Sequence, residues 1–319
     1  MTTFLRLLAE DDKAAALAQS CARVRQGEDE ARCFEVAPEE FDAVPGKPFA
    51  YWVSDNIRLT FSRCPPFESG GRNGKQGLAT ADDFRFVRIW WETTGGGPKD
   101  GWSLFAKGGA FSPFYADVYL TVNWRTTGAE IKNNLNEKGG IRSNVWMLRD
   151  TATNFFCRLG LTWPLRTNGL SFRVMPAGCI FGHKGPAAFL ADDDPETLLA
   201  LVCLLNSSAF GLLVSVQLAR VELAQSFEVG LIQQTPVPDL SAKQRAQLAT
   251  LARRAWSLKR SLDTIIETSH AFLLPATLRP RAGDFDPPAI GAELARIQAD
   301  IDAIAIEGAC LARLAPHLP

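Results

Sequence analysis

Runs of glycine interrupt the middle of the chain and limit what it can fold into. They lie at Gly70–Gly71, Gly95–Gly97, Gly108–Gly109 and Gly139–Gly140. Between them the apolar stretches are short, and Val118–Trp124 alternates apolar and polar residues. Short alternating stretches bounded by glycine predict strands joined by tight turns, because a long helix would not tolerate these interruptions.

Both ends of the chain carry a helical pattern instead. Apolar residues recur at helical spacing over Phe4–Gln26, and the apolar run Leu198–Val216 predicts two core helices separated by a polar kink. Ser241 predicts the cap of a long helix that reaches about Phe272, and Ala289–Ala312 predicts another. A short strand is expected at Val229–Ile232.

The expected fold class is therefore α+β, with three regions along the chain. Residues 64–190 are expected to form a mixed, mostly antiparallel β-rich domain. A helical region over residues 1–63 precedes it, and a helical region over residues 191–319 follows it.

Charge is unevenly distributed, although the net charge is only −1. Residues 61–190 carry 16 basic and 9 acidic side chains, whereas residues 1–60 carry 7 and 11, and residues 191–319 carry 11 and 15. Thr151–Leu190 contains four cations and neither Asp nor Glu. This stretch predicts a surface for an anionic ligand. The alternative is a pair of strands whose arginines are solvated or paired with distant carboxylates.

No motif for catalysis, a cofactor or a metal is found. The chain has three histidines, and His270 is expected within a helix. Gly70–Lys75 lacks the spacing of a phosphate-binding loop and predicts a flexible turn. Asp286–Ala289 lacks the aromatic residue that completes the acidic-Pro-Pro-aromatic motif of amino-methyltransferases.

The cysteines and the apolar run favour a cytoplasmic protein with no membrane span. Seven scattered cysteines without a metal-binding spacing predict reduced thiols. Acidic residues Glu10, Asp11 and Asp12 follow too soon after Met1 for a signal peptide. Polar residues such as Asn206 interrupt the run Leu198–Val216, so it is expected to form a buried core.

Short motifs spread over residues 32 to 275 resemble one family in order and spacing. They are Val44–Trp52, Gly77–Arg88, Phe105–Gly109, Ser112–Asp117, Gly160–Pro164, Gly185–Pro186, Leu204–Ser207 and Gln233–Pro238. Together they resemble the region that follows the catalytic domain in adenine-specific DNA methyltransferases. These are the PglX-like enzymes of BREX phage defence and the related Eco57I- and MmeI-like restriction–modification enzymes.

The resemblance implies a target-recognition region that binds double-stranded DNA. It also implies a separate methyltransferase domain or subunit that binds S-adenosylmethionine and methylates adenine at N6, so no cofactor is expected in this chain. The expected chain is then a specificity subunit from a split gene or a remnant of a longer enzyme. One departure is that the usual Thr-Gly-Asp-Asn appears as Thr80–Asp83, which is expected to alter a tight turn.

The residues expected to contact DNA are the polar and cationic side chains of the matching segments. They are Lys75, Arg85, Arg88, Lys107, Arg158, Thr162, Arg166, Ser171, Arg173 and Lys184. Thr162, Arg166 and Arg173 are the expected base readers, because they fall on one strand–turn–strand unit whose glycines permit close approach to DNA. Arginine can also form paired hydrogen bonds with guanine in the major groove. Trp163 is expected to anchor a buried turn.

Two rival hypotheses fit the same sequence features. In the first, the chain is a protein-binding structural or interaction module whose basic face has no role with DNA. In the second, it is an independent enzyme, which requires a pocket with convergent titratable groups.

Overall fold

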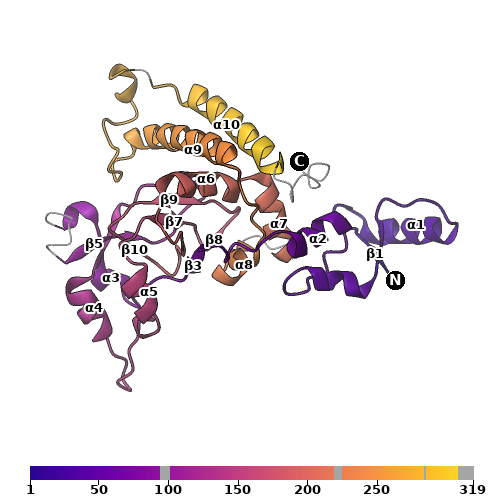
Figure 1. Ribbon diagram of the computed structural model, residues 1–319, viewed down its shortest axis with the longest axis horizontal. Coiled ribbons are helices and arrows are strands. Elements are labelled where there is room, and N and C mark those ends of the chain that lie inside the picture. Colours follow the sequence, from indigo (N-terminus) through magenta and orange to yellow (C-terminus); the bar gives the residue numbers. More distant parts are fainter. Residues whose placement is uncertain (94–100, 219–224, 284, 308–319) are drawn as a thin grey trace.

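The computed structural model describes residues 1–93, 101–218, 225–283 and 285–307, and it confirms the α+β class. An N-terminal lobe projects from a β-rich middle, and a layer of helices covers one side of that middle (Figure 1). In this layer, helices α9 (Ala242–Leu262) and α10 (Pro287–Glu307) lie side by side over α6 (Pro195–Leu205).

The N-terminal lobe combines helices with a small sheet. Its elements are β1 (Thr2–Leu5), α1 (Lys13–Arg25), β2 (Cys33–Val36), the 3-10 helix η1 (Pro38–Ala43) and α2 (Asp55–Arg63). β1 pairs antiparallel with β2, and the Phe4 ring stacks on Tyr51 with 4.6 Å between centroids. The prediction of a helix from Phe4 is therefore wrong. Helix α1 begins only after Asp12, whose side chain accepts hydrogen bonds from two backbone N–H groups of the first turn.

The β-rich middle is built from short elements. They are β3 (Asn73–Lys75), α3 (Asp83–Phe86), β4 (Val87–Ile89), η2 (Trp90–Glu92), β5 (Trp102–Ala106), β6 (Leu120–Asn123), α4 (Arg125–Lys132), η4 (Val145–Met147), α5 (Arg149–Asn154), β7 (Gly160–Thr162), β8 (Arg166–Thr167), β9 (Arg173–Met175), β10 (Cys179–Phe181) and β11 (Ala187–Phe189). Asn73–Lys75 was expected to belong to a flexible turn, but it pairs with β11 as an edge strand.

Two four-stranded sheets organise these strands. One has the order β10-β5-β6-β4, and within it only β10 and β5 run parallel. The other has the order β3-β11-β7-β9 and is antiparallel throughout. The mostly antiparallel character is confirmed. The division of the chain at residues 63 and 190 stays a prediction. Strand β8 pairs with β12 (Gln225–Ser226), which lies beyond residue 190.

The helical layer follows the sheets in the chain. Its elements are α6 (Pro195–Leu205), α7 (Ser208–Leu218), the strand β12 (Gln225–Ser226), α8 (Val229–Gln234), α9 (Ala242–Leu262), η5 (Asp263–Ile265), η6 (Arg279–Arg281) and α10 (Pro287–Glu307). Ser241 and Gln244 form a reciprocal capping box at the start of α9. Helix α9 ends ten residues earlier than expected, since Asp263 begins a 3-10 turn.

One expected strand is a helix. Residues Val229–Gln234 form α8, whose Ile232 is fully buried. The Gln233 side-chain amide donates to the backbone oxygen of Gly74 at 3.1 Å and so ties α8 to β3. A short apolar pattern fits a strand or a helix equally well, and in the folded protein this segment packs against β3 as a helix.

Three hydrophobic clusters hold the parts together. The largest lies between the antiparallel sheet and helices α6, α9 and α10, and it contains Trp163. The indole N–H of this fully buried residue donates to the Phe227 carbonyl at 2.8 Å, which confirms its expected role as an anchor. A second cluster lies on the mixed sheet, and a third joins α7 to the N-terminal lobe.

The junction of α6 and α7 is fixed by polar contacts. Asn206 accepts a hydrogen bond from the Phe172 N–H and donates to the Phe172 carbonyl, both at 2.8 Å. On the other side of the bend, Asp302 of α10 accepts from the N–H and the hydroxyl of Ser208. These contacts link the sheet, α6, α7 and α10 at one point.

The apolar helices also bear on the membrane expectation. Within the described residues, no single helix has the length and hydropathy to cross a membrane. Helices α6 and α7 have that length and hydropathy only when they are taken together, and a bend of 60° separates them.

The cysteines depart in part from expectation. Cys21, Cys33, Cys157, Cys179 and Cys203 are free thiols. Cys64 is disulfide-bonded, so the expectation of reduced thiols is wrong at this position.

We predict that Asn206→Ala lowers the free energy of unfolding by about 2 kcal/mol, because it leaves the buried Phe172 N–H without its partner. Chemical denaturation measures this change. The control Asn133→Ala removes an exposed amide at the end of α4 and should change the value by less than about 0.5 kcal/mol. Equal effects of the two substitutions would show that the Asn206 contacts are not stabilising.

Candidate nucleic-acid interface

The ends of two parallel strands bring two lysines to one edge of the mixed sheet. β5 ends just before Lys107, and β10 ends shortly before Lys184. The loops that follow are in close contact, because a Cβ on Gly108 would overlap the Lys184 carbonyl oxygen. Gly108 also has a φ of +91°, which glycine adopts without strain.

A tight turn over Thr80–Asp83 lies beside these loops. The backbone of Leu78 holds it there, through its N–H bonded to Phe181 and its carbonyl bonded to His183. Within the turn, the Thr80 hydroxyl donates to the Asp83 carboxylate at 2.6 Å. Asp82 caps α3 by accepting from the Arg85 N–H at 3.1 Å.

The turn and the two loops enclose a cavity of about 300 Å³. Its lining includes Thr80, Asp83, Lys107, His183 and Lys184. Burial by itself would raise the pKa of Asp83, but the hydrogen bonds from Lys107 and Thr80 outweigh it and hold that pKa below its usual value. Asp83 is therefore ionised at neutral pH and paired with Lys107.

Four of the predicted residues gather along this edge, and we call them the cationic edge: Arg85, Lys107, Arg166 and Lys184. Arg166 adjoins Lys184 because the N–H of the preceding Leu165 donates to the Lys184 carbonyl at 2.9 Å. Arg85 lies on the same short helix as Asp83. Arg85, Arg166 and Lys184 are exposed, and among the described residues none of the three has an ion-pair partner.

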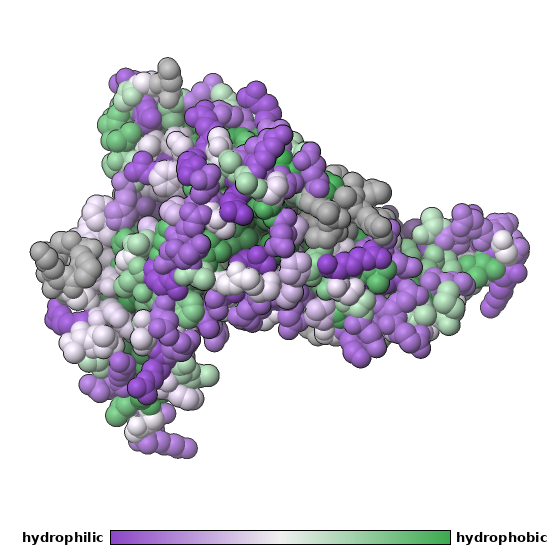
Figure 2. Space-filling view, in the orientation of Figure 1, coloured by the Kyte–Doolittle hydropathy of each residue, from purple (hydrophilic) through white to green (hydrophobic). Residues whose placement is uncertain are grey.

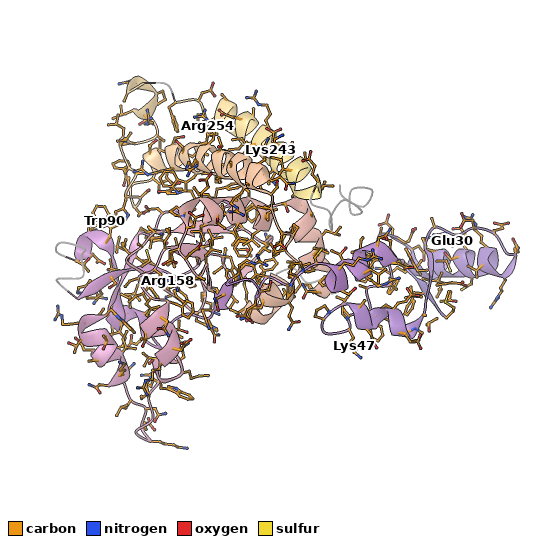
Figure 3. All side chains as sticks on the ribbon, in the orientation of Figure 1. Glu30, Lys47, Trp90, Arg158, Lys243 and Arg254 are labelled. Carbon is orange, nitrogen blue, oxygen red and sulfur yellow. The ribbon has the colours of Figure 1, made fainter. Side chains whose placement is uncertain are left out.

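Three other predicted cations are partly occupied by their own chain. Lys75 is 3.5 Å from the Asp150 carboxylate. Arg88 donates to the carbonyls of Phe84 and Val87. Arg158 (labelled in Figure 3) is partly buried, pairs with Asp193 and donates to the Leu190 carbonyl.

The remaining three predicted residues are buried. The Thr162 hydroxyl donates to the Pro186 carbonyl at 2.8 Å, and the Ser171 hydroxyl accepts from the Ser112 N–H. Arg173 is 4% exposed and donates to the carbonyls of Gly108 and Ala110. Burial lowers the pKa of Arg173 to about 10. These three side chains are buried and hydrogen-bonded to groups of their own chain, so they do not belong to the cationic edge.

A protruding segment was not among the predicted residues. Residues 125–149 form the downward extension in Figure 1 and carry five basic and two acidic side chains. Lys132, Lys138, Arg142 and Arg149 are exposed there, and Trp146 is 64% exposed. The turn at Gly139–Gly140 was the available sequence signal, because a glycine turn flanked by cations places them at a loop tip.

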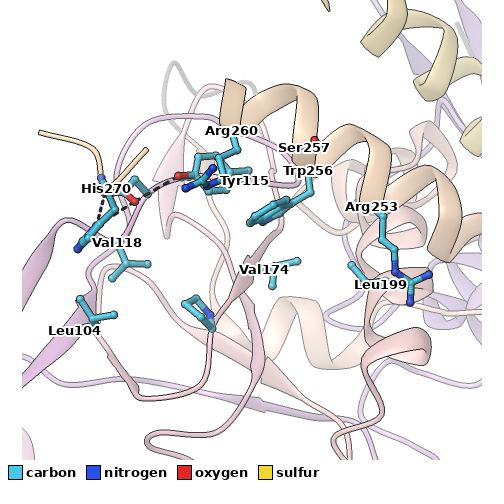
Figure 4. A pocket seen from close by; sticks show the side chains of 13 residues that line it. Leu104, Tyr115, Val118, Val174, Leu199, Arg253, Trp256, Ser257, Arg260 and His270 are labelled. Atoms are coloured by element: carbon cyan, nitrogen blue, oxygen red, sulfur yellow. Dashed lines mark hydrogen bonds and ion pairs between the residues drawn. The ribbon is translucent and has the colours of Figure 1, made fainter. Parts of the chain in front are cut away.

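A larger pocket of about 630 Å³ lies under α9 (Figure 4). Trp256 projects from α9 into it, and Val118 and Val174 form walls. Figure 2 shows hydrophobic residues in the recess below the helical layer, whose outer surface is mostly hydrophilic. This pocket adjoins a smaller hollow beside Lys107, because Asp117 and Val118 line both.

One end of the pocket is closed by an ionisable cluster. His270 lies in a turn after α9, not in the helix that was expected, and its N–H and Nδ1 both contact the Asp117 carboxylate. The Tyr115 hydroxyl lies 3.3 Å from the same carboxylate. Burial and the charge of Asp117 raise the pKa of Tyr115 to about 12, so its hydroxyl stays protonated. Among the described residues, no group of three or more His, Cys, Asp or Glu could hold a metal ion.

We predict that Ala81→Gly raises the free energy of unfolding by about 0.5–1 kcal/mol. Ala81 has a φ of +61°, and this left-handed backbone costs an L-residue about 1–2 kcal/mol, a strain that glycine does not have. The net gain is smaller than this strain, because glycine also increases the conformational entropy of the unfolded chain. Thermal or chemical denaturation measures the gain. The control Ala79→Gly has no such strain to relieve and should lower stability; a gain in both variants would contradict the argument.

Comparison with known proteins shows similarity to two methyltransferases. No protein-family model matches the chain. It is 28% identical over 247 residues to the adenine-specific methyltransferase PglX of Lacticaseibacillus casei (strain Zhang). It is 24% identical over 249 residues to the adenine-specific methyltransferase BrxX of Escherichia coli O9:H4 (strain HS). These alignments cover 73% and 75% of this chain but 19% of each relative, so the chain spans about a fifth of their length.

A solved structure is also similar in outline. The type IIL restriction–modification enzyme MmeI, solved in complex with DNA, matches 76% of this chain and 33% of its own, with a TM-score of 0.47 and 13% identity. The resemblance to PglX-like enzymes expected from the motifs is confirmed by the sequence alignments. Over about three quarters of its length, this chain is homologous to part of the adenine-specific methyltransferases PglX and BrxX.

Proposed function

We propose that this chain is the DNA sequence-recognition module of a site-specific DNA adenine-N6 methyltransferase of a restriction–modification or BREX system. The observation that carries the proposal is the alignment with adenine-specific methyltransferases, which covers most of this chain and about a fifth of theirs. The sequence of this chain carries no recognised S-adenosylmethionine loop or catalytic motif, and its structure presents the cationic edge.

The cationic edge supports contact with a DNA backbone. Lys184 and Arg85 are exposed, and among the described side chains neither has a carboxylate partner, so a phosphate can replace their water and counterions. Lys107 is paired with Asp83, and this pair fixes its position beside Lys184. Such contacts position a protein on DNA without reading its sequence.

Base reading is assigned to Arg166 in this proposal. It is exposed in β8, next to Lys184, and its guanidinium has the fork that binds the O6 and N7 atoms of guanine. A separate catalytic domain or subunit supplies S-adenosylmethionine and receives the target adenine, which such enzymes extrude from the duplex. The partners in this proposal are therefore double-stranded DNA and a methyltransferase catalytic part.

We predict that the chain binds duplex DNA with an affinity that falls steeply between low and moderate salt. Lys184→Ala should weaken binding to all sequences alike and reduce the slope of log affinity against log salt by about one unit. Fluorescence anisotropy with labelled duplexes over a salt series measures both quantities. The matched control is Arg254→Ala, because Arg254 lies on α9 (Figure 3) and is already paired with Glu293.

The rival interaction-module hypothesis makes the opposite forecast. If Lys184→Ala, Arg254→Ala and the parent all show the same weak binding with no salt dependence, the cationic edge is not a DNA surface, and a protein ligand becomes the better hypothesis.

We predict that Arg166→Ala reduces discrimination between the preferred and scrambled duplexes by about 1–3 kcal/mol while retaining most of the non-specific affinity. The preferred sequence is first selected from randomised duplexes by the chain assembled with its methyltransferase partner. Competition binding then compares the parent with Arg166→Ala and, as a control, Lys184→Ala. Unchanged discrimination in Arg166→Ala would remove this residue from the base-reading role.

A further inference from the structure

We propose that the pocket under α9 binds a nucleotide, with its base stacked on Trp256 and its phosphates held by Arg253 and Arg260. Such a pocket requires a ligand that carries a planar aromatic ring next to a negative charge. This proposal rests on the proposed function in one respect, namely that the nucleotide belongs to a bound DNA strand.

The interior of the pocket suits an aromatic ring. Trp256 is half-buried and meets Tyr115 edge-to-face, with 5.4 Å between centroids. Val118, Val174 and Leu199 supply aliphatic walls. A nucleobase fits easily within 630 Å³, and base-on-aromatic stacking accepts any base because each has a π-face.

The mouth of the pocket suits phosphate. Arg253 and Arg260 are exposed, both line the pocket, and neither forms an ion pair with any described residue. Seven residues of α-helix span about 10 Å, so Arg253 and Arg260 flank Trp256 along α9. The Arg260 guanidinium lies over one face of the Trp256 ring, 5.9 Å from its centroid, which leaves the other face for a base. A nucleotide within a strand has a phosphate on each side of its sugar, which matches this arrangement better than a free monophosphate does.

The pocket also lies close to the proposed DNA surface. It shares the Asp117–Val118 segment with the hollow that Lys107 lines, and Lys107 in turn lines the cavity beside Lys184. The three hollows are therefore neighbours, and the one beside Lys107 lies between the cationic edge and the pocket that contains Trp256. The closed end is rigid, because Asp117 is held by His270 and Tyr115.

The test compares three probes on the intact chain. They are a fully paired duplex, the same duplex with one bulged 2-aminopurine, and free deoxyadenosine monophosphate. We expect the bulged duplex to bind about tenfold more tightly than the paired one and its 2-aminopurine fluorescence to be quenched by stacking. Trp256→Ala should abolish both effects, and Trp256→Phe should retain most of them. Arg254→Ala, a control on the same helix whose cation is already paired with Glu293, should not change them.

Arg253→Ala gives an independent readout should Trp256→Ala disturb folding. Arg253 is exposed and lines the pocket, so this substitution should reduce the preference for the bulged duplex while leaving the Arg260–Trp256 cation–π contact in place. If deoxyadenosine monophosphate binds in a manner that depends on Trp256 while no duplex binds, the pocket assignment is supported and the proposed DNA-recognition function is overturned. If the paired and bulged duplexes bind equally and the monophosphate does not bind, the pocket assignment is overturned, although the DNA-recognition function stands.

Discussion

A two-way hydrogen bond between one side chain and one buried backbone residue joins the two layers of this protein. Asn206, at the end of α6, accepts from the N–H of Phe172 and donates to its carbonyl. Asp302 then fixes the start of α7 from the other side through Ser208. The bend between α6 and α7 is thereby determined: α6 stays over the sheet, while α7 turns away and carries the N-terminal lobe through a shared hydrophobic cluster.

The neighbours of Phe172 in the chain are buried together with it. Ser171 and Arg173 are buried on either side of it, and Arg173 donates to two carbonyls of the loop that follows β5. A pKa lowered to about 10 still leaves this guanidinium protonated at neutral pH, so it remains a donor in that loop. Because the loop also carries Lys107, a buried arginine helps to set the place of an exposed lysine. Buried polar groups of this kind are stable only when they are fully hydrogen-bonded.

Local patterns predicted the helices of the C-terminal layer well and the strands less well. Helical spacing and the Ser241 cap are properties of neighbouring residues, so the start of α9 follows from the sequence. Strand β1 depends on pairing with β2, about thirty residues away, and α8 depends on its contact with β3. Patterns of four to six residues do not encode such partners, and tertiary contacts override weak local preference.

The candidate site also depends partly on local sequence and partly on tertiary contacts. By itself the sequence determined the α+β class, the excess of positive charge in residues 61–190, and the motifs that match adenine-specific methyltransferases. Only the tertiary structure decided which of these cations face water: it exposed Arg166 and Lys184, and it buried Arg173 among carbonyls. Composition reports how many charges a segment carries. Their exposure depends on strand register and on which backbone groups remain unpaired nearby, and those are set by contacts between residues far apart in the chain.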